Sequence, residues 1–296
     1  MGRIANLLEP DLLFETNRGV PLSPVMQTCI ALNSYAGGQF QRISGLCGDV
    51  SQHAVRMALN RVTNALVKKR NQFIFMPTSA EMDDRFHLSR FAMAVDVMQV
   101  RFQKHEQQFW CRKQFYSINV QVVAGDRFIY DLDCRWPGST HDSRIWNRSQ
   151  VKAYLEQQRR FLLAGDSGYP ISEILIKPYT TVESGQDRTK RLFNRRLSGL
   201  RTVMSENIYG VWKRRFPILK SMRTDFLLSQ RIIVATAVLF NIGRLWGDEE
   251  DDDEERDDDD EPDGEMDQVV VLEGDPGTVR VRGQVERDRL KDAMQN

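Results

Sequence analysis

The chain has 296 residues, 41% of them hydrophobic and 28% charged, which is enough for one large domain or two smaller ones with a buried core. Its formal net charge of +0 conceals two opposite parts. Residues 1–247 carry 35 bases and 20 acids, whereas residues 248–296 carry 6 bases and 21 acids. A basic body with an acidic tail is typical of a protein that binds a polyanion, although an acidic low-complexity tail can also serve solubility alone.

Cysteine usage and hydropathy limit the class of protein further. The four cysteines lie far apart without a CxxC pair, which argues against a disulfide scaffold and a zinc finger and favours a reducing compartment. The longest uninterrupted apolar run, IIVATAVLF, is too short to span a bilayer, and the first residues lack the apolar core of a signal peptide. We therefore expect an intracellular protein without a membrane partner.

The first helical segments are expected over residues 22–70. Ser51 is a good N-cap for the last of them, which is basic and has apolar residues at helical spacing on one face. Two short helices, a glycine-containing turn and this third helix form a plausible helix-turn-helix, whose last helix would offer Gln52, His53 and Arg56 to a DNA groove. A helical hairpin that merely packs is the alternative interpretation.

Strand-like patterns follow at residues 90–102, 115–125 and 127–136. A helix is then expected after Thr140, which can cap it, and a short apolar run of buried-strand type at residues 160–166. Together these elements predict a mixed α/β domain, in which the apolar helix expected at 225–246 packs in the core. The predicted organisation is a helical DNA-binding module at 1–75, an α/β domain at 76–247 and an acidic disordered tail with a short terminal helix at 248–296.

The segment GDSGYP at 165–170 is one letter away from GDSGGP, which surrounds the nucleophilic serine of trypsin-like proteases. That fold is normally secreted and disulfide-bonded, and it needs a histidine as general base in a context that this chain lacks. Tyr169 also replaces a glycine where the backbone must approach the substrate closely. We therefore expect Asp166, and not Ser167, to carry the function of this segment.

Three carboxylates stand in positions that suit a metal site. Asp96 interrupts an apolar strand, Asp166 follows the end of another, and Glu206 lies on a later helix. A buried carboxylate is costly unless it is paired or binds a metal, and α/β sheets place their chemistry at strand ends. The three could bind two Mg²⁺ ions about 4 Å apart for phosphodiester cleavage. Asp133 and Asp142 are rival candidates on local sequence alone.

Several longer blocks resemble a known family, in order and spacing: FYSINVQVVAGDRFIYDLDCRWPGSTHDSRIWNRS, LLAGDSGYPISEILIKPY, FNRRLSGLRTVMSENIYGVWKRRFPIL and IIVATAVLFNI. They resemble the Harbinger (PIF-type) transposases and the nucleases derived from them. The resemblance implies an RNase H-like catalytic domain with Asp96, Asp166 and Glu206 as its Asp-Asp-Glu set. It also implies a DNA endonuclease dependent on Mg²⁺ or Mn²⁺, with two ions, located in the nucleus and secondarily in the cytoplasm. A Myb-like partner protein, and assembly into a homo-oligomer, are further expectations.

Basic residues near these blocks are candidates for contacts with DNA phosphates. They are Arg112, Lys113, Lys213, Arg214 and Arg215. Ordinary solvated faces would account for them equally well.

A non-catalytic nuclear regulator that binds DNA or a partner is the alternative function. It is favoured by the residues after Asp96, where Val97, Met98 and Gln99 depart from the family pattern.

Overall fold

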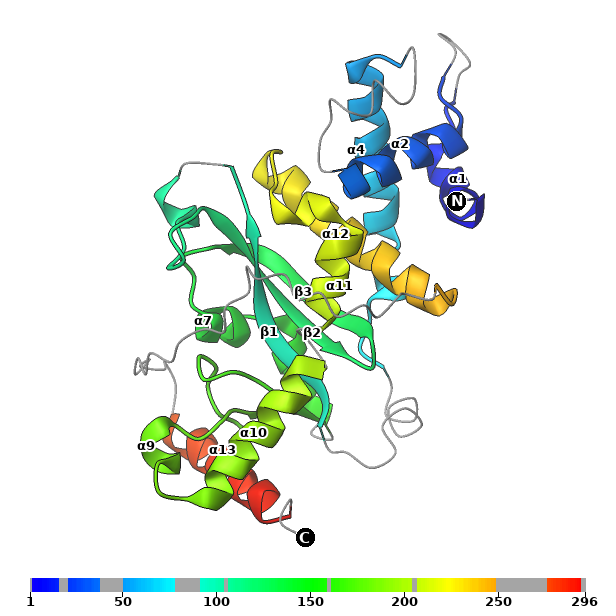
Figure 1. Ribbon diagram of the computed structural model, residues 1–296. Helices are drawn as coiled ribbons and strands as arrows, with labels where there is room; N and C mark the ends of the chain where they lie inside the picture. Colours follow the sequence, from blue (N-terminus) through cyan, green and yellow to red (C-terminus); the bar gives the residue numbers. More distant parts are fainter. Residues whose placement is uncertain are drawn as a thin grey trace. The chain divides into compact units, whose positions relative to one another are not determined.

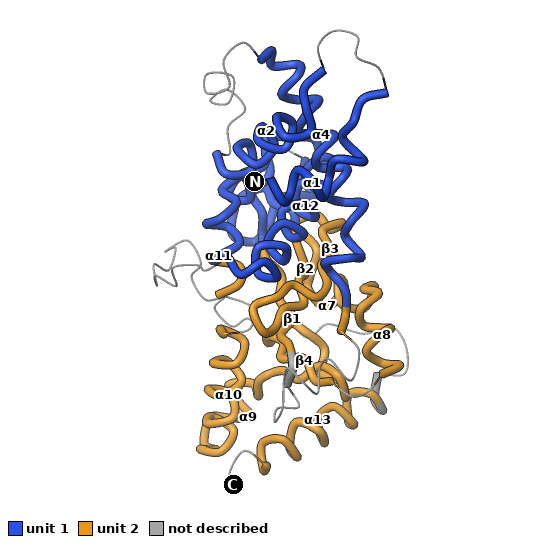
Figure 2. The backbone as a smooth tube through the Cα atoms, turned by 90° about the vertical axis from the view of Figure 1, so that its right-hand side faces the viewer, with its two compact units in different colours: residues 1–75, 99–118, 211–250 blue, residues 76–98, 119–210, 251–296 orange. Residues whose placement is uncertain are grey.

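The computed structural model (Figure 1) describes residues 2–15, 21–37, 50–77, 91–103, 106–158, 161–203, 207–248 and 276–293. The chain forms two compact units, each assembled from separate stretches (Figure 2). Unit 1 combines residues 1–75, 99–118 and 211–250. Unit 2 combines residues 76–98, 119–210 and 251–296.

Unit 1 is a helical bundle. Its helices are α1 (Gly2–Leu12), α2 (Pro24–Gly37), α4 (Gln52–Lys68), α5 (Arg70–Phe73) and α12 (Phe226–Leu245). Helices α1 and α2 pack against α4, and α12 packs against α4 and α5. The long helix from the second half of the sequence therefore shares a core with the first 75 residues.

Polar side chains tie these helices together. The guanidinium of Arg61 on α4 donates to the side-chain oxygen of Gln27 and to the backbone oxygens of Leu12 and Leu13. At the start of α4, the Ser51 side chain accepts a hydrogen bond from the Ala54 N–H, which confirms the predicted N-cap. The middle helix of the predicted helix-turn-helix falls among residues 38–49, outside the described residues.

Helix α12 is long and apolar enough to cross a membrane by length and composition, yet 78% of its most apolar window is buried inside the protein. Asp225 caps its first turn by accepting from the Leu228 N–H, and the Asn241 amide donates to the Phe73 oxygen at 2.7 Å. These contacts identify α12 as a core helix of unit 1, as the apolar pattern predicts.

Unit 1 also contains two short 3₁₀ helices, η1 (Gln107–Phe109) and η3 (Pro217–Lys220). Helix α11 (Asn207–Arg215) begins in unit 2 and ends in unit 1.

The sheet has five strands in the order β3-β2-β1-β4-β5. They are β1 (Phe91–Arg101), β2 (Ser117–Gly125), β3 (Phe128–Pro137), β4 (Leu162–Ala164) and β5 (Leu175–Ile176). Strand β4 pairs in parallel with β1 and with β5. Between β2 and β3, Asp126 and Arg127 both have positive φ, as a two-residue hairpin turn requires. The structure thus confirms the predicted mixed α/β sheet flanked by helices.

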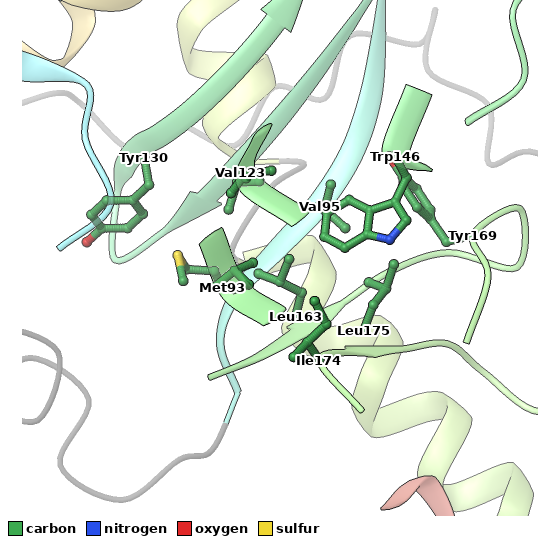
Figure 3. Close-up of a cluster of buried hydrophobic side chains, with 11 residues drawn as sticks. Met93, Val95, Val123, Tyr130, Trp146, Leu163, Tyr169, Ile174 and Leu175 are labelled. Carbon is green, nitrogen blue, oxygen red and sulfur yellow. The ribbon is translucent and has the colours of Figure 1, made fainter. Parts of the chain in front are cut away.

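Alternate residues of β1 and β4 face two different cores. Met93, Val95 and Leu163 point to the core shown in Figure 3, which they share with Trp146 and Tyr169. Helices α7 (Asp142–Asn147) and α8 (Gln150–Gln158) cover this side.

The other face of the sheet carries Ala94, Leu162 and Ala164. Phe193 and Leu197 pack on it from α10 (Arg188–Arg201), close to the short helix α9 (Thr181–Ser184). Small residues at 94 and 164 allow α10 to lie close to the strands at this point.

The helix predicted after Thr140 is in fact two helices. The N-cap of α7 is His141, so the predicted cap at Thr140 is wrong. Ser149 divides the two helices: its hydroxyl donates to the Trp146 oxygen and accepts from the Lys152 N–H. A side chain that bonds to the backbone in both directions competes with a continuous helix.

Helix α13 (Pro276–Ala293) packs against α10 and β5 within unit 2 (Figure 1). Leu290 enters the same core as Phe193. Gly283 faces the Ser172 backbone so closely that a Cβ there would lie 2.8 Å from the Ser172 nitrogen. The acid-rich residues are thus followed by a helix that belongs to the folded domain.

Candidate active site

The register of the parallel strands brings two predicted acids to the same level. Ala94 of β1 pairs with Ala164 of β4, and Asp96 and Asp166 each stand two residues further along. Neighbouring strands are about 4.8 Å apart, and residues two apart share a face of the sheet. Asp96 lies within β1, whereas Asp166 follows the end of β4, and the charges of both acids act on the Tyr169 hydroxyl.

Asp96 is held by several partners within unit 2. One carboxylate oxygen accepts from the Val97 N–H at 2.8 Å, and the other forms an ion pair with the Arg201 guanidinium at 3.3 Å. Both side chains are mostly buried, with 20% and 16% of their surfaces exposed. The Tyr209 hydroxyl donates to the backbone oxygens of Asp96 and Val122. The Asp96 carboxylate is thus fixed in place and partly neutralised.

The third predicted acid, Glu206, lies outside the described residues. The described residues on either side of it, Arg201 and Tyr209, both contact Asp96. The chain therefore approaches Asp96 before and after the gap.

Asp166 begins a turn that brings its carboxylate close to Gly168. The Gly168 N–H donates to the Asp166 carboxylate at 3.0 Å, and Lys177 donates to the Ser167 oxygen at 3.0 Å. A Cβ on Gly168 would lie 3.3 Å from an oxygen of Asp166 and 3.3 Å from an oxygen of Asp142. Asp142, the first residue of α7, therefore faces the same small space as Asp166.

Tyr169 lies fully buried next to these acids. Burial, followed by the negative charges of Asp142, Asp96 and Asp166, raises the pKa of its hydroxyl well above the ordinary value. Its ring packs edge-on against Trp146, and within the described chain its hydroxyl has no hydrogen-bond partner (Figure 3). The hydroxyl of Tyr169 therefore stays protonated, and it is a buried donor near these acids.

The structure distinguishes the candidate site from two rival interpretations, Asp133 as a site acid and Ser167 as a nucleophile. Asp133 is buried and bound to Arg135 and Trp136; burial raises the pKa of its carboxyl, but these hydrogen bonds outweigh it and leave the pKa below the ordinary value. Asp133 is therefore a structural residue. Ser167 is exposed, and no described histidine forms a hydrogen bond with its hydroxyl, so the geometry of a serine hydrolase is absent from the described residues.

The donors suit a hard divalent cation by chemistry. Carboxylate oxygens are the ligands that Mg²⁺ and Mn²⁺ prefer, and oxygens of Asp142 and Asp166 both approach Gly168. Among the described residues, however, no three Asp, Glu, His or Cys side chains converge as a complete metal-binding group. Asp96 and Asp166 can supply ligands, and the set needs at least one more.

The residues predicted to bind DNA are all in unit 1. Gln52, His53 and Arg56 are exposed on the first turns of α4. Arg112 and Lys113 are exposed in the turn between η1 and β2. These two groups are accessible to a ligand.

The predicted bases of α11 differ among themselves. Arg214 is exposed and Lys213 is half-buried, whereas Arg215 forms an ion pair with Asp248. Arg215 is therefore already engaged within the chain.

Sequence reasoning missed Arg201, Tyr209 and Lys177, and it considered Tyr169 only as a departure from a protease motif. Their contacts depend on how α10, α11 and β5 lie against the sheet, which spacing does not reveal. Asp142 had a sequence signal, an acid at the start of a helix, but nothing in the sequence placed it beside Asp166.

The five-stranded mixed sheet with helices on both faces is that of an RNase H-like domain. Residues 94–241, half of the chain, match the family described as DDE superfamily endonuclease. The chain therefore belongs to the DDE superfamily endonucleases, in the branch derived from Harbinger transposases. Endonucleases of this superfamily generally use divalent metal ions.

Curated relatives extend over most of the chain. "Putative nuclease HARBI1" of Rattus norvegicus is 26% identical over 94% of this chain and 84% of its own length, and the Homo sapiens protein of the same name is 26% identical over 81% and 72%. "Protein ALP1-like" of Arabidopsis thaliana is 23% identical over 77% of this chain and 63% of its own. No solved structure matches the chain significantly.

Proposed function

We propose that the protein is a divalent-metal-dependent DNA endonuclease that hydrolyses phosphodiester bonds. Its ligands are Asp96 and Asp166, with Glu206 as the third acid. The observation that supports the proposal is the pairing of Ala94 with Ala164, because Asp96 and Asp166 each follow these residues by two positions. Mg²⁺ or Mn²⁺, as two ions, is the cofactor that this acid set suits.

Each side chain around the acids has a role in this proposal. When bound, the metal supplies a more acidic water and neutralises charge on the phosphate. Asp96 and Asp166 hold the cation, Asp142 adds negative charge on the side of Gly168, and the protonated Tyr169 donates a hydrogen bond into the site. Arg201 balances the charge of Asp96 and must rearrange or share that carboxylate when a cation binds.

Cleavage of supercoiled plasmid in Mg²⁺ or Mn²⁺ tests the proposal, with wild-type protein compared with Asp166→Asn. We expect nicking to fall about 1,000-fold, because losing one ligand of the cation removes roughly 4 kcal/mol of stabilisation in the transition state. Asp126→Asn is the matched control. Asp126 is exposed in the β2–β3 turn with positive φ, a conformation that asparagine tolerates.

Equal nicking by both variants, or nicking that persists in chelator, would refute the assignment. Loss of nicking in the Asp166 variant alone would establish Asp166 as a ligand and Ser167 as a bystander.

A non-catalytic DNA-binding or partner-binding regulator is the second candidate. The ion pair between Arg201 and Asp96 favours it, because a guanidinium on this carboxylate competes with a metal ion. Titration calorimetry with Mn²⁺ separates the two functions: affinity that is lost in Asp96→Ala supports the enzyme, and no binding together with intact DNA affinity supports the regulator.

Targeting is part of the same proposal. In this proposal the exposed residues Gln52, His53 and Arg56 of α4 contact DNA, and Arg112, Lys113, Lys213 and Arg214 contact its phosphates. A Myb-like partner would supply further DNA targeting and import into the nucleus, as the Harbinger resemblance implies. Nuclear accumulation that depends on co-expression of such a partner is the observation that would support it.

A further inference from the structure

The solvent face of α10 carries a continuous row of arginines. Arg188, Arg191, Arg195 and Arg196 recur at intervals of three, four and one residues and are all exposed. At 3.6 residues per turn these positions form one stripe, which Gly199 continues on the next turn. We call these four residues the arginine stripe. The whole helix contains six bases and no acid.

The opposite face of α10 determines the direction of the stripe. Phe193 and Leu197 are buried in the core under the sheet, with 2% and 0% of their surfaces exposed. Asn194 exchanges two hydrogen bonds of 2.8 Å with the backbone of Tyr179. Helix α10 is therefore fixed in rotation, and the arginine stripe cannot turn toward the interior.

Among the described residues, no acid is paired with Arg188, Arg191 or Arg195 of the stripe. The Arg191 guanidinium donates to the backbone oxygens of Ser184 and Gly185, which leaves its positive charge uncompensated by a carboxylate. In the part of the chain that the structure describes, Arg188 and Arg195 form no ion pair. Several like charges at helical neighbours repel one another by a few tenths of a kcal/mol per pair, so the stripe carries a cost in the isolated domain.

The stripe leads to the candidate active site. Arg201, the last residue of α10, forms the ion pair with Asp96, and the stripe, Asp96 and Asp166 all belong to unit 2. From Arg188 to Arg196 the helix rises about 12 Å at 1.5 Å per residue, which matches about three phosphates of one DNA strand at 3.4 Å of axial rise each.

We propose that the arginine stripe of α10 binds the phosphate backbone of duplex DNA next to the bond that the aspartates address. Arginine suits this ligand because its planar guanidinium binds a phosphate through two parallel hydrogen bonds. The inference rests on the proposed function only in taking DNA as the ligand. It assigns a contact surface to unit 2, whereas the bases predicted from sequence lie in unit 1.

The first test measures DNA affinity against salt concentration for the full chain without metal. The logarithm of the affinity falls with the logarithm of salt with a slope of about 0.9 per phosphate contact on B-DNA. Arg188→Gln with Arg195→Gln should therefore lower the slope by about 1.8. Arg148→Gln with Lys152→Gln is the matched control, because Arg148 and Lys152 lie at α7 and α8 on the other side of the sheet, and it should leave the slope unchanged.

The second test adds charge at Gly199, where a Cβ would have no neighbour within 4 Å. Gly199→Arg should raise the slope by about 0.9, and Gly199→Glu should weaken binding. Both variants replace glycine by a long side chain, and they differ only in its charge. A difference in DNA binding between them therefore reflects the attraction of positive charge to the phosphates. Equal thermal unfolding of the variants would show that the fold is retained.

Unchanged slopes in both tests would overturn the proposal. Tighter DNA binding by the Arg188/Arg195 variant would overturn it as well. Plasmid nicking is scored separately: wild-type protein that binds through the stripe but never nicks would refute the endonuclease and leave the DNA surface in place.

Discussion

A Cβ at position 168 would lie close to the carboxylates of Asp142 and Asp166, so the role of the glycine can be tested by substitution. We expect Gly168→Ala to weaken Mn²⁺ binding at unchanged net charge. The added methyl group would lie 3.3 Å from oxygens of both Asp142 and Asp166, so those carboxylates must move by a few tenths of an ångström. Calorimetry measures the change, and a loss of about tenfold is expected from displaced ligands.

Gly199→Ala is the control for this substitution, since a Cβ there meets nothing. Wild-type affinity in Gly168→Ala would show that the space beside Gly168 is not part of the cation site.

At the residue scale, the sequence does not distinguish a structural aspartate from a candidate site aspartate. Asp96 and Asp133 are both acids within strands, and local pattern does not separate them. The structure does: Asp133 is bound by Arg135 two residues away, whereas Asp96 is bound by Arg201 from a helix 105 positions later in the chain. A residue's role follows from such distant partners.

Among the elements, α13 has the most unusual anchor, a buried arginine. The Arg287 side chain is 5% exposed, forms an ion pair with Glu183 at 2.9 Å and stacks over the Tyr179 ring. We expect Arg287→Met to destabilise the attachment of α13 by about 1–3 kcal/mol, because it removes a buried guanidinium together with its ion pair to the partly exposed Glu183. Hydrogen exchange of the α13 amides measures this directly.

Arg289→Met is the matched control, since Arg289 is 71% exposed and its partner Glu286 is on the same helix. If exchange in α13 were equally fast in wild type and Arg287→Met, the anchor would be irrelevant.

The same anchor should depend on pH. Burial raises the pKa of the Glu183 carboxyl, but hydrogen bonds from Thr180 and the charge of Arg287 outweigh it and hold the pKa below the ordinary value. The contribution of Glu183 is therefore complete above the ordinary pKa of a glutamate and is lost as the pH falls through the lower pKa of the folded protein.

Elements with strong local signals were predicted from sequence, and those that depend on packing were not. The strands β1, β2 and β3 and the core helix α12 follow from apolar periodicity, and the structure confirms them. The division of α7 from α8 follows from the two hydrogen bonds of Ser149, which periodicity does not detect. For α13, the sequence predicts a short helix, but its polar composition gives no indication of a binding face under α10 and β5.

At the scale of the whole molecule, the C-terminal part of the chain consists of two segments with different properties, one strongly acidic and one packed into unit 2. Residues 249–275 contain 17 acids and one base, while α13, which follows them, packs into unit 2. Replacing 249–275 by a Gly/Ser sequence of equal length should therefore tighten nonspecific DNA binding at low salt and leave thermal unfolding unchanged.

Truncation after residue 248 should behave differently. It removes the same acids but also uncovers the core that Leu290 enters, so we expect a lower unfolding temperature in addition. Identical unfolding of the two variants would show that α13 contributes nothing to unit 2, and unchanged DNA binding in both would leave the acids with solubility as their role.

The pairing of Ala94 with Ala164 also determines which natural length changes this fold can absorb. Residues inserted between Ala164 and Asp166 would move Asp166 relative to Asp96 and leave the pairing of Ala94 with Ala164 intact. Insertions in the surface turns carry no such penalty. A protein descended from this chain can therefore keep the fold and lose the site. The spacing from Ala94 to Asp96 and from Ala164 to Asp166 shows whether the two acids can still meet.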